Sequence, residues 1–297
     1  RSALSKPSKA LKNYFKIISL DDSINVCKNQ DDQIFFTITN KQWESDFYGR
    51  KFGSLQIGNF DYLNKFSYKQ IAEPLDELMT CADKKNYDII EIHIDINNIR
   101  IIPILEGAGF RLVDTRITFL TLINKEEYEI MPLSTETIAN ATLDDLDAIN
   151  KLTKESFIDN NNFHHRFKDE RYFSKDEIVQ YYHAWICNHI KDKDTYFIVM
   201  KDKGRLFAYF IYKKICFFQG IPLYKGILTA VDPDYRGNSY HLHMQGYLYK
   251  QFPEKQFYLD NTTQLTNIAT IKNHIKSQKK LNRIVLTFFR RRDIQIS

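Results

Sequence analysis

The stretch that decides the fold is Leu228-Thr-Ala-Val-Asp-Pro-Asp-Tyr-Arg-Gly-Asn-Ser-Tyr240. It has the pattern of a strand, a turn that contains proline, and an Arg-Gly-x-Ser segment that opens a helix. Glycine lets the backbone approach a ligand closely, and the free N–H groups at a helix start bind phosphate oxygens. The sequence therefore predicts an anion cradle directly after the edge of a strand. The two commoner phosphate loops, GxxxxGK[ST] and GxGxxG with a downstream acid, are absent from the sequence.

Strand-like and helix-like segments alternate along the chain. Alternating and β-branched runs predict strands at 33–39, 52–60, 88–94, 110–122, 196–200, 205–218, 225–231, 256–259 and 284–289. Helical spacing predicts helices at 70–86, 101–107, 240–250 and 264–277. Capping boxes at Thr142–Asp145 and Ser174–Glu177 predict two further helix starts. This order predicts an α/β (α+β) fold in which helices flank a mixed sheet.

The chain divides into two halves at the polar stretch Asn124–Glu127. Both halves end in a strand, an acidic residue with a nearby asparagine, a helix and a closing strand, at 89–122 and 257–289. Asp95 in the first half and Asp260 in the second are expected to follow their strands in the same way. This repetition indicates a diverged internal duplication. We therefore expect a degenerate N-terminal domain over 1–127, which shapes the substrate site, and a second domain over 128–297, which carries the cradle.

The composition of the 297-residue chain is that of an ordinary globular protein, with 43% hydrophobic and 27% charged residues. It excludes the collagen-like, wholly disordered and disulfide-scaffold classes. No apolar run reaches the roughly 18 residues that a membrane-spanning helix needs, and the first residues show no apolar segment of a secretion signal. The sequence contains four scattered cysteines without metal-ligand spacing, Cys27, Cys81, Cys187 and Cys216. We therefore expect reduced structural thiols, a cytoplasmic location and no metal site.

The formal net charge of +5 is mild for a nucleic-acid-binding protein. The one dense basic cluster, Arg290–Arg292, follows a predicted strand and fits a solvated chain end better than a phosphate contact. A modest positive excess also suits a protein whose ligands are small anions, because its field raises their local concentration. We expect a small-molecule ligand, no nucleic acid and no insertion into a membrane. A nucleic-acid-binding protein would differ by a steep dependence of affinity on salt.

At the cradle, the sequence resembles the GNAT superfamily of acyl-CoA-dependent N-acyltransferases. The signature of that family, Q/R-x-x-G-x-G/A, stands here as Asp234-Tyr-Arg-Gly237-Asn-Ser239. Gly237 fits the signature, whereas Asp234 and Ser239 depart from it at the first and last positions. The resemblance implies a GNAT-type mixed sheet, acetyl-CoA as co-substrate and direct attack by an amine in a ternary complex. It also implies that the second domain is catalytic and that the first is a degenerate GNAT-like domain.

Four other segments are similar to one branch of this family, the bacterial TDP-fucosamine acetyltransferases, which acylate a nucleotide-linked 4-amino-4,6-dideoxy sugar. Trp43–Gly49 resembles its W-D-S-x-F-F-G element, and Gly109–Phe119 resembles its G-F-x-L-V-D-T segment. Arg166–Asp169 resembles its R-F-H-x-D motif, and Tyr182–Trp185 its Y-x-x-W motif. The resemblance covers nearly the whole chain and implies a nucleotide-sugar substrate whose product enters a surface glycan such as lipopolysaccharide.

The resemblance also assigns roles to individual residues. Backbone N–H groups of Ala230 and Val231 would bind the thioester oxygen. His274 occupies the position of the family's tyrosine in N-x-A-x-x-x-x-Y, and an imidazole can donate a proton to sulfur. The other expected ligand contacts are Arg236, Gly237, Asn238, Ser239, Tyr240 and Asn267 for the co-substrate, and Arg166, Asp169 and Tyr182 for the sugar nucleotide.

Several alternatives remain open at the level of sequence. Asn267 can cap a helix instead of binding the pantetheine arm. The general base is not identified, and Asp260, His241 and His243 are candidates by position alone. The protein could use another amine or a longer acyl chain, or could bind CoA without catalysis, because the signature is altered and the tyrosine is replaced. The oligomeric state is open, a homodimer included.

Overall fold

The computed structural model describes residues 15–19, 25–29, 34–58, 60–127, 136–161 and 163–292. The chain forms two compact units, of which the first comprises Arg1–Asp114 with Val285–Ser297 and the second Thr115–Ile284. The predictions about the first residues of the chain and about the side chain of Cys27 lie outside the described residues.

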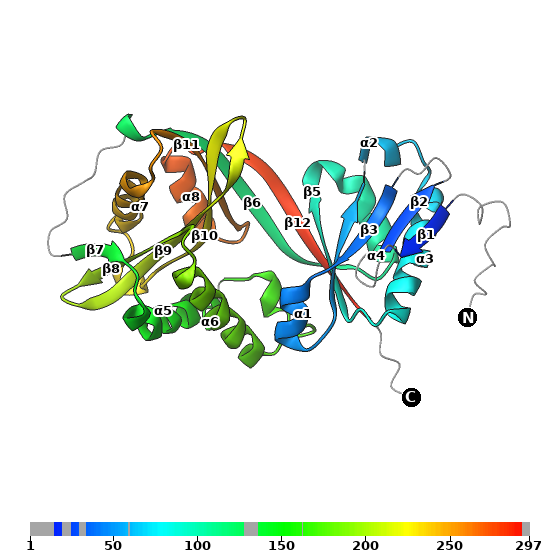
Figure 1. The fold of residues 1–297 in the computed structure, drawn as a ribbon, viewed down its shortest axis with the longest axis horizontal. Coiled ribbons are helices and arrows are strands. Elements are labelled where there is room, and N and C mark those ends of the chain that lie inside the picture. The colour runs from blue at the N-terminus through cyan, green and yellow to red at the C-terminus, as the bar shows by residue number, and fades with distance from the viewer. Residues whose placement is uncertain are drawn as a thin grey trace. The chain divides into compact units, whose positions relative to one another are not determined.

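The first unit is a mixed sheet with helices (Figure 1). Its strands are β1 (Phe15–Ser19), β2 (Asn25–Asn29), β3 (Ile34–Asn40), β4 (Phe52–Ile57), β5 (Ile89–Asp95) and the end of β12 (Leu281–Arg291), in that spatial order. Neighbouring strands are antiparallel, except for the parallel pair β4–β5. The helices are α1 (Gln42–Tyr48), α2 (Phe60–Leu63), α3 (Tyr68–Lys84) and α4 (Ile102–Gly107). Ser67 and Gln70 form a capping box that begins α3, whose Leu75 and Leu78 are fully buried in the core of this unit.

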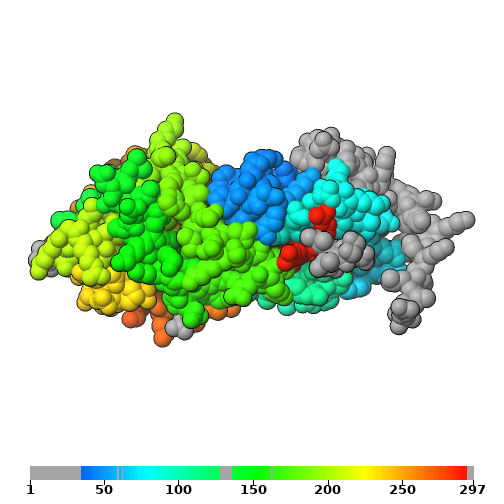
Figure 2. Space-filling model, turned by 90° about the horizontal axis from the view of Figure 1, so that it is seen from below, coloured from blue at the N-terminus to red at the C-terminus, as the bar shows by residue number. Residues whose placement is uncertain are grey.

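The second unit has the spatial strand order β6 (Arg111–Asn124), β11 (Gln256–Gln264), β10 (Ile221–Val231), β9 (Arg205–Phe218), β8 (Thr195–Asp202) and β7 (Glu136–Asn140). Among the described strands of this unit, β10 and β11 pair in parallel and the other neighbours in this order are antiparallel. Helices α5 (Leu146–Thr153) and α6 (Lys175–Lys191) lie on one face of the sheet, and α7 (Tyr240–Gln251) and α8 (Ile268–Lys276) lie on the other (Figure 1). α5, α6 and the segment between them contribute to the green surface in Figure 2.

The closing strands of the two halves are exchanged. β6 follows α4 in the sequence but pairs with β11, from Arg116 opposite Gln264 to Asn124 opposite Gln256. β12 follows α8 but its residues from Val285 onward pair with β5. The division into units therefore differs from the predicted boundary between 127 and 128, because strand pairing assigns 115–127 to the second unit and 285–291 to the first.

The predicted α/β fold with a mixed sheet and flanking helices is confirmed, as are both predicted capping boxes. Three details are wrong. The strand predicted over 52–60 ends at Ile57, and Phe60 begins α2; the helix predicted over 264–277 begins only at Ile268. Asp260 lies inside β11 and does not follow it, because this strand continues to Gln264 beside β6. Asp95 is the last residue of β5, where it accepts a hydrogen bond from the Asn97 N–H at 3.0 Å, so the two aspartates do not occupy matching positions.

Candidate functional site

The two parallel strands at the centre of the second unit separate. β10 and β11 are paired at only three positions, the last being Lys225 opposite Asp260, although β10 continues to Val231 and β11 to Gln264. Gly226 stands where they part, and a Cβ atom there would lie 3.2 Å from the Asn261 Oδ1. Beyond this point β10 still pairs with β9, but its other edge has lost its partner strand. Backbone N–H and C=O groups on such an edge can bind an extended ligand.

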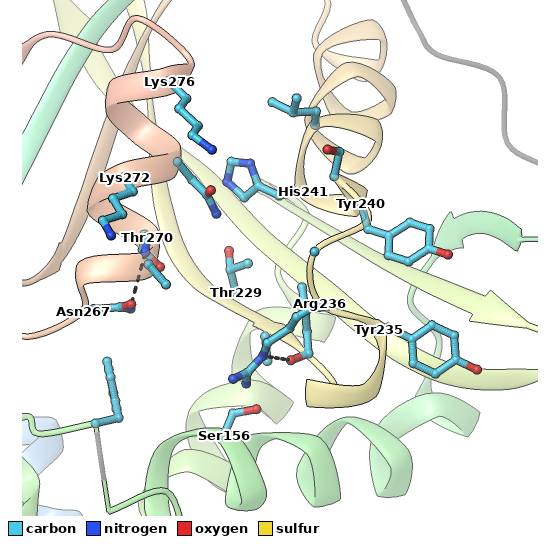
Figure 3. Close-up of a pocket in the computed structure, with 18 of the residues that line it drawn as sticks. Ser156, Thr229, Tyr235, Arg236, Tyr240, His241, Asn267, Thr270, Lys272 and Lys276 are labelled. Carbon is cyan, nitrogen blue, oxygen red and sulfur yellow. Dashed lines mark hydrogen bonds between the residues drawn. The ribbon is translucent and has the colours of Figure 1, made fainter.

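A cavity of about 550 Å³ opens beside this edge. Its volume is within the range of small-molecule sites, about 300–1,000 Å³. Figure 3 shows side chains from α7, α8, β10 and the segment after α5 converging on it. The residues that line it are Ser156, Phe157, Asn160, Phe163, Thr229, Ala230, Val231, Tyr235, Arg236, Gly237, Ser239, Tyr240, His241, Leu242, Asn267, Ala269, Thr270, Lys272, Asn273, Lys276 and Ser277.

The loop between β10 and α7 is held in an unusual backbone conformation. Gly237 has φ +91° and Ser239 has φ +58°, so two residues of the predicted cradle are left-handed. Arg236 donates a hydrogen bond from Nε to the Val231 carbonyl at 3.0 Å, which ties the loop to the end of β10. Asn238 is exposed and donates from Nδ2 to the Tyr235 carbonyl at 3.4 Å. Left-handed residues in a turn can direct neighbouring N–H groups to one side, an arrangement that binds anions.

The N-terminus of α7 is open toward this cavity. Ser239 is the N-cap, but its side chain makes no capping hydrogen bond. The first N–H groups of a 12-residue helix are therefore not capped by a side chain, and the helix dipole adds positive potential there. Tyr240 is held by Glu136, to which its hydroxyl donates at 2.6 Å, and this hydrogen bond raises the pKa of Tyr240 to about 12. In Figure 3 its ring points to the same side as that of Tyr235, away from the side chains of α8, with 6.3 Å between the two tyrosine centroids.

The side chains that line the cavity carry positive charge only. Arg236, Lys272 and Lys276 line it, and no aspartate or glutamate does so in the part of the chain that the structure describes. Lys272 and Lys276 are one turn apart on α8 and lie on the same side of the cavity (Figure 3). The loop, the helix terminus and these cations together form a site for a ligand with several negative charges.

Asn267 has the capping role that the sequence left open, and it also lines the cavity. It is the N-cap of α8, and its Oδ1 accepts a hydrogen bond from the Thr270 N–H at 3.3 Å. Because Asn267 also lines the cavity, its Nδ2 group remains a donor for a ligand. Figure 3 shows the capping bond at the edge of the site.

His274 lies behind the wall of the cavity and does not line it. Its side chain is 4% exposed, with the ring centroid 4.9 Å from that of Phe119 and 6.1 Å from that of His241. Its Nδ1 has no hydrogen-bond partner among the described residues. Burial, reinforced by the charges of Lys279 and His241, lowers the pKa of His274 to about 2. The ring is therefore neutral at physiological pH.

His241 lines the cavity in its place. This residue is in the first turn of α7, and its ring points toward α8 (Figure 3). Burial, together with the charge of Lys279, lowers the pKa of His241 to about 3. The other two candidate bases, His243 and Asp260, do not line the cavity, and Asp260 accepts a hydrogen bond from the Thr262 hydroxyl at 3.0 Å.

The three residues predicted to bind the sugar nucleotide do not line this cavity. Asp169 is paired with Arg171 at 2.5 Å, and this hydrogen bond lowers the pKa of the Asp169 carboxyl. Arg166 lies over the Phe167 ring, 4.7 Å from its centroid. Tyr182 is 6% exposed and is stacked on Phe157, with 5.9 Å between centroids. Phe157 does line the cavity, so Tyr182 is one layer behind its wall.

Sequence reasoning missed Lys272, Lys276 and Ser156. The two lysines could have been found, because they follow the Asn267 cap at a spacing that places them on one helix face. The Oγ of Ser156 is buried beside the cavity and makes no hydrogen bond to any residue that the structure describes. This serine is in a π-helical turn, Lys154–Ile158, for which the sequence has no recognisable signal.

The sequence matches no protein-family model and no curated protein. Several solved structures are nevertheless similar to the structure of this chain. A GCN5-related N-acetyltransferase from Sphaerobacter thermophilus is 9% identical, with 92% of this chain and 82% of that chain covered and a TM-score of 0.54. A tandem GNAT protein from the clavulanic acid biosynthesis pathway is 8% identical, with 90% and 82% covered and a TM-score of 0.57.

A third similar structure is the glucosamine N-acetyltransferase region of a fungal multi-domain β-N-acetylglucosaminidase. It is 11% identical, with 89% of this chain and 32% of that chain covered and a TM-score of 0.52. At such low identity these similarities establish the fold alone. The chain therefore has the GCN5-related N-acetyltransferase fold in a two-domain arrangement, as the sequence predicted. Within the described ranges no helix has the length and apolar character needed to cross a membrane.

Proposed function

We propose that the protein is an N-acetyltransferase that transfers the acetyl group of acetyl-CoA to a primary amine. The observation that carries this proposal is the positively lined cavity at the point where β10 and β11 separate. The phosphates of the co-substrate would bind the N–H groups of residues 237–240, with Arg236, Lys272 and Lys276 around them. The pantetheine arm would follow the unpaired edge of β10, where Asn267 can donate a hydrogen bond to it.

The reaction needs one bond to form and another to break. The neutral amine attacks the thioester carbon, the C–N bond forms, and the C–S bond breaks as CoA thiolate leaves. The proton that the nitrogen loses passes to the thiolate, directly or through water, so that the products are the N-acetyl amide and free CoA thiol.

The Val231 N–H would stabilise the negative oxygen of the intermediate, because Val231 faces the edge of β10 that has lost β11 and its carbonyl accepts from Arg236 there. The predicted role of the Ala230 N–H does not fit, because successive N–H groups of a strand point to opposite edges and that of Ala230 faces β9, as does the N–H of Asp232. The neutral His241 ring, which lines the cavity, can donate a hydrogen bond to the departing sulfur, and His274 would support it from behind.

The acceptor we propose is the amine of a nucleotide-linked amino-deoxy sugar for a surface glycan. Its support is the sequence resemblance in four segments and the similar fungal region, which is described as acting on glucosamine. Arg166, Asp169 and Tyr182 would belong to the acceptor side, and the first unit would shape it. The cysteines described, Cys81, Cys187 and Cys216, are free thiols, which agrees with a cytoplasmic location.

Calorimetric titration of acetyl-CoA into the purified protein tests the first step, with ATP as an anionic control. We expect saturable binding that is stronger than that of ATP, and an Arg236→Ala variant should bind more weakly. Release of free CoA thiol is then measured with amino-sugar nucleotides, free amino sugars, polyamines and peptides as acceptors. Binding without turnover by any amine would favour a non-catalytic CoA-binding protein, which the departures at Asp234 and Ser239 also suggest.

A further inference from the structure

Lys279 is a buried lysine without a partner. Its side chain is 5% exposed, and its Nζ makes no hydrogen bond to any described residue. The local fold explains this position. The Gln278 N–H donates to the Ile275 carbonyl and the Lys279 N–H donates to the His274 carbonyl, with Gln278 left-handed at φ +55°. This is the Schellman ending of a helix, in which the residue after the left-handed one usually packs an apolar side chain inward.

His274, whose carbonyl accepts from the Lys279 N–H, is also unsatisfied, because its Nδ1 has no partner among the described residues. Gln245 on α7 is likewise fully buried, with neither side-chain polar atom bonded within the described residues. His241, one turn before Gln245, connects this group to the cavity because its ring lines the wall. The rings of Phe119 and Phe210, from β6 and β9, complete the surroundings of the two histidines.

No carboxylate in the part of the chain that the structure describes compensates Lys279. Burial alone lowers its pKa, to about 7, and the titratable groups that feel its charge are His241 and His274. The nearby cavity wall adds only the cations Lys272 and Lys276. A buried, unpaired cation costs several kcal/mol, and an anion close by is what reduces this cost.

We propose that Lys279 is an internal counter-charge for the anionic ligand of the cavity, and that it takes up a proton when this ligand binds. The proposal rests on the proposed function for the identity of the ligand, CoA. It adds a residue that does not line the cavity but stabilises the bound anion from behind the wall, and that carries more positive charge in the complex than in the free protein. A neutral ligand of the same size would bind without this contribution, so the lysine favours polyanions.

The expected effect follows from linkage. If the bound anion raises the pKa of Lys279 by one unit from about 7, the protein takes up about half a proton per CoA at pH 7.5. The same increase of one pKa unit makes the affinity for CoA about eightfold higher at pH 6 than at pH 9. The direction of the pH dependence follows, because CoA binds more tightly where Lys279 is protonated. This gain in affinity is lost as the pH rises through the higher pKa that Lys279 has in the complex.

Calorimetry of free CoA binding at pH 7.5 in HEPES, Tris and MOPS measures proton uptake from the dependence of heat on buffer ionisation. The variants are Lys279→Met, which keeps the length of the chain, and Lys280→Met, the exposed neighbour as control. We expect uptake in the wild type and in Lys280→Met, and none in Lys279→Met beyond that of the CoA phosphates. Thermal unfolding checks that each variant is folded. If Lys279→Met does not fold, the affinity of the wild type for CoA is measured between pH 6 and pH 9, and the expected fall in affinity toward pH 9 tests the role of Lys279 instead.

The outcomes separate the two proposals. Tight CoA binding with equal proton uptake in wild type and Lys279→Met, or with a wild-type affinity that does not depend on pH beyond ligand ionisation, overturns the role of Lys279 and leaves the proposed function intact. If CoA does not bind, the proposed function fails, and inorganic pyrophosphate is titrated in its place. Uptake with pyrophosphate that is lost in Lys279→Met supports the counter-charge alone, and failure of both anions to bind overturns both proposals.

Discussion

Replacing Lys279 by methionine should stabilise the protein at neutral pH. A lysine with pKa about 7 in the folded state and 10.5 when unfolded binds fewer protons in the folded state throughout this interval. By linkage it lowers the free energy of unfolding by about 4 kcal/mol at pH 7 and by about 2 kcal/mol at pH 9. The penalty is complete below the folded pKa and disappears as pH approaches the unfolded one. We therefore expect Lys279→Met to be more stable than wild type, with an advantage that shrinks by about 2 kcal/mol from pH 7 to pH 9.

Denaturant unfolding followed by tryptophan fluorescence measures this difference. The chain has two tryptophans, Trp43 in the first unit and Trp185 in the second. A Trp43→Phe background therefore makes fluorescence report on the second unit, which contains Lys279, and avoids averaging two transitions. Lys280→Met, an exposed change of the same chemistry, serves as the control. An advantage that is absent at pH 7, or that is the same at pH 7 and pH 9, would refute the buried and unpaired state of Lys279.

Three further predictions concern the cavity. Lys272→Ala and Lys276→Ala should each weaken CoA binding about fivefold at low salt and less at high salt, because both side chains are exposed cations. Calorimetry at two salt concentrations measures this effect. If the two lysines play no part, the variants and the wild type will have the same affinity at both concentrations. His274→Phe should lower turnover at least about tenfold with little change in acetyl-CoA affinity, and unchanged turnover removes His274 from the mechanism. Ser239→Gly should raise stability by about 0.5–1 kcal/mol in thermal unfolding, because its φ of +58° suits glycine. A loss of stability there would mean that the serine hydroxyl has a role not seen in its contacts.

The local parts of the site could be predicted from the sequence. The anion cradle depends on a short stretch whose Gly237 and following helix leave few conformations open, and the structure has the strand, the turn and the helix as expected. The capping boxes at Thr142 and Ser174 are local for the same reason, since donor and acceptor are three residues apart. Such features need no knowledge of the rest of the fold.

Features that depend on tertiary packing could not be predicted. Whether His241 or His274 faces the cavity depends on how α7 and α8 are rotated against the sheet, and only the contacts of His274 with Phe119 and His241 reveal it. The length of β11, which puts Asp260 inside the strand, is set by its pairing with β6 from more than 130 positions earlier in the chain. Tertiary pairing of this kind overrides local pattern.

The exchange of β6 and β12 has a consequence for how the chain is made. The sheet of the first unit needs residues 285–291, which are synthesised only after the whole of the second unit, whereas the sheet of the second unit needs β6 from the first half. Until β12 arrives, the edge of β5 has no neighbour on that side, and an unpaired edge of this kind invites aggregation. A gene cut at codon 127 would therefore yield two fragments that each lack a strand, and the two halves would have to be produced together to form either sheet.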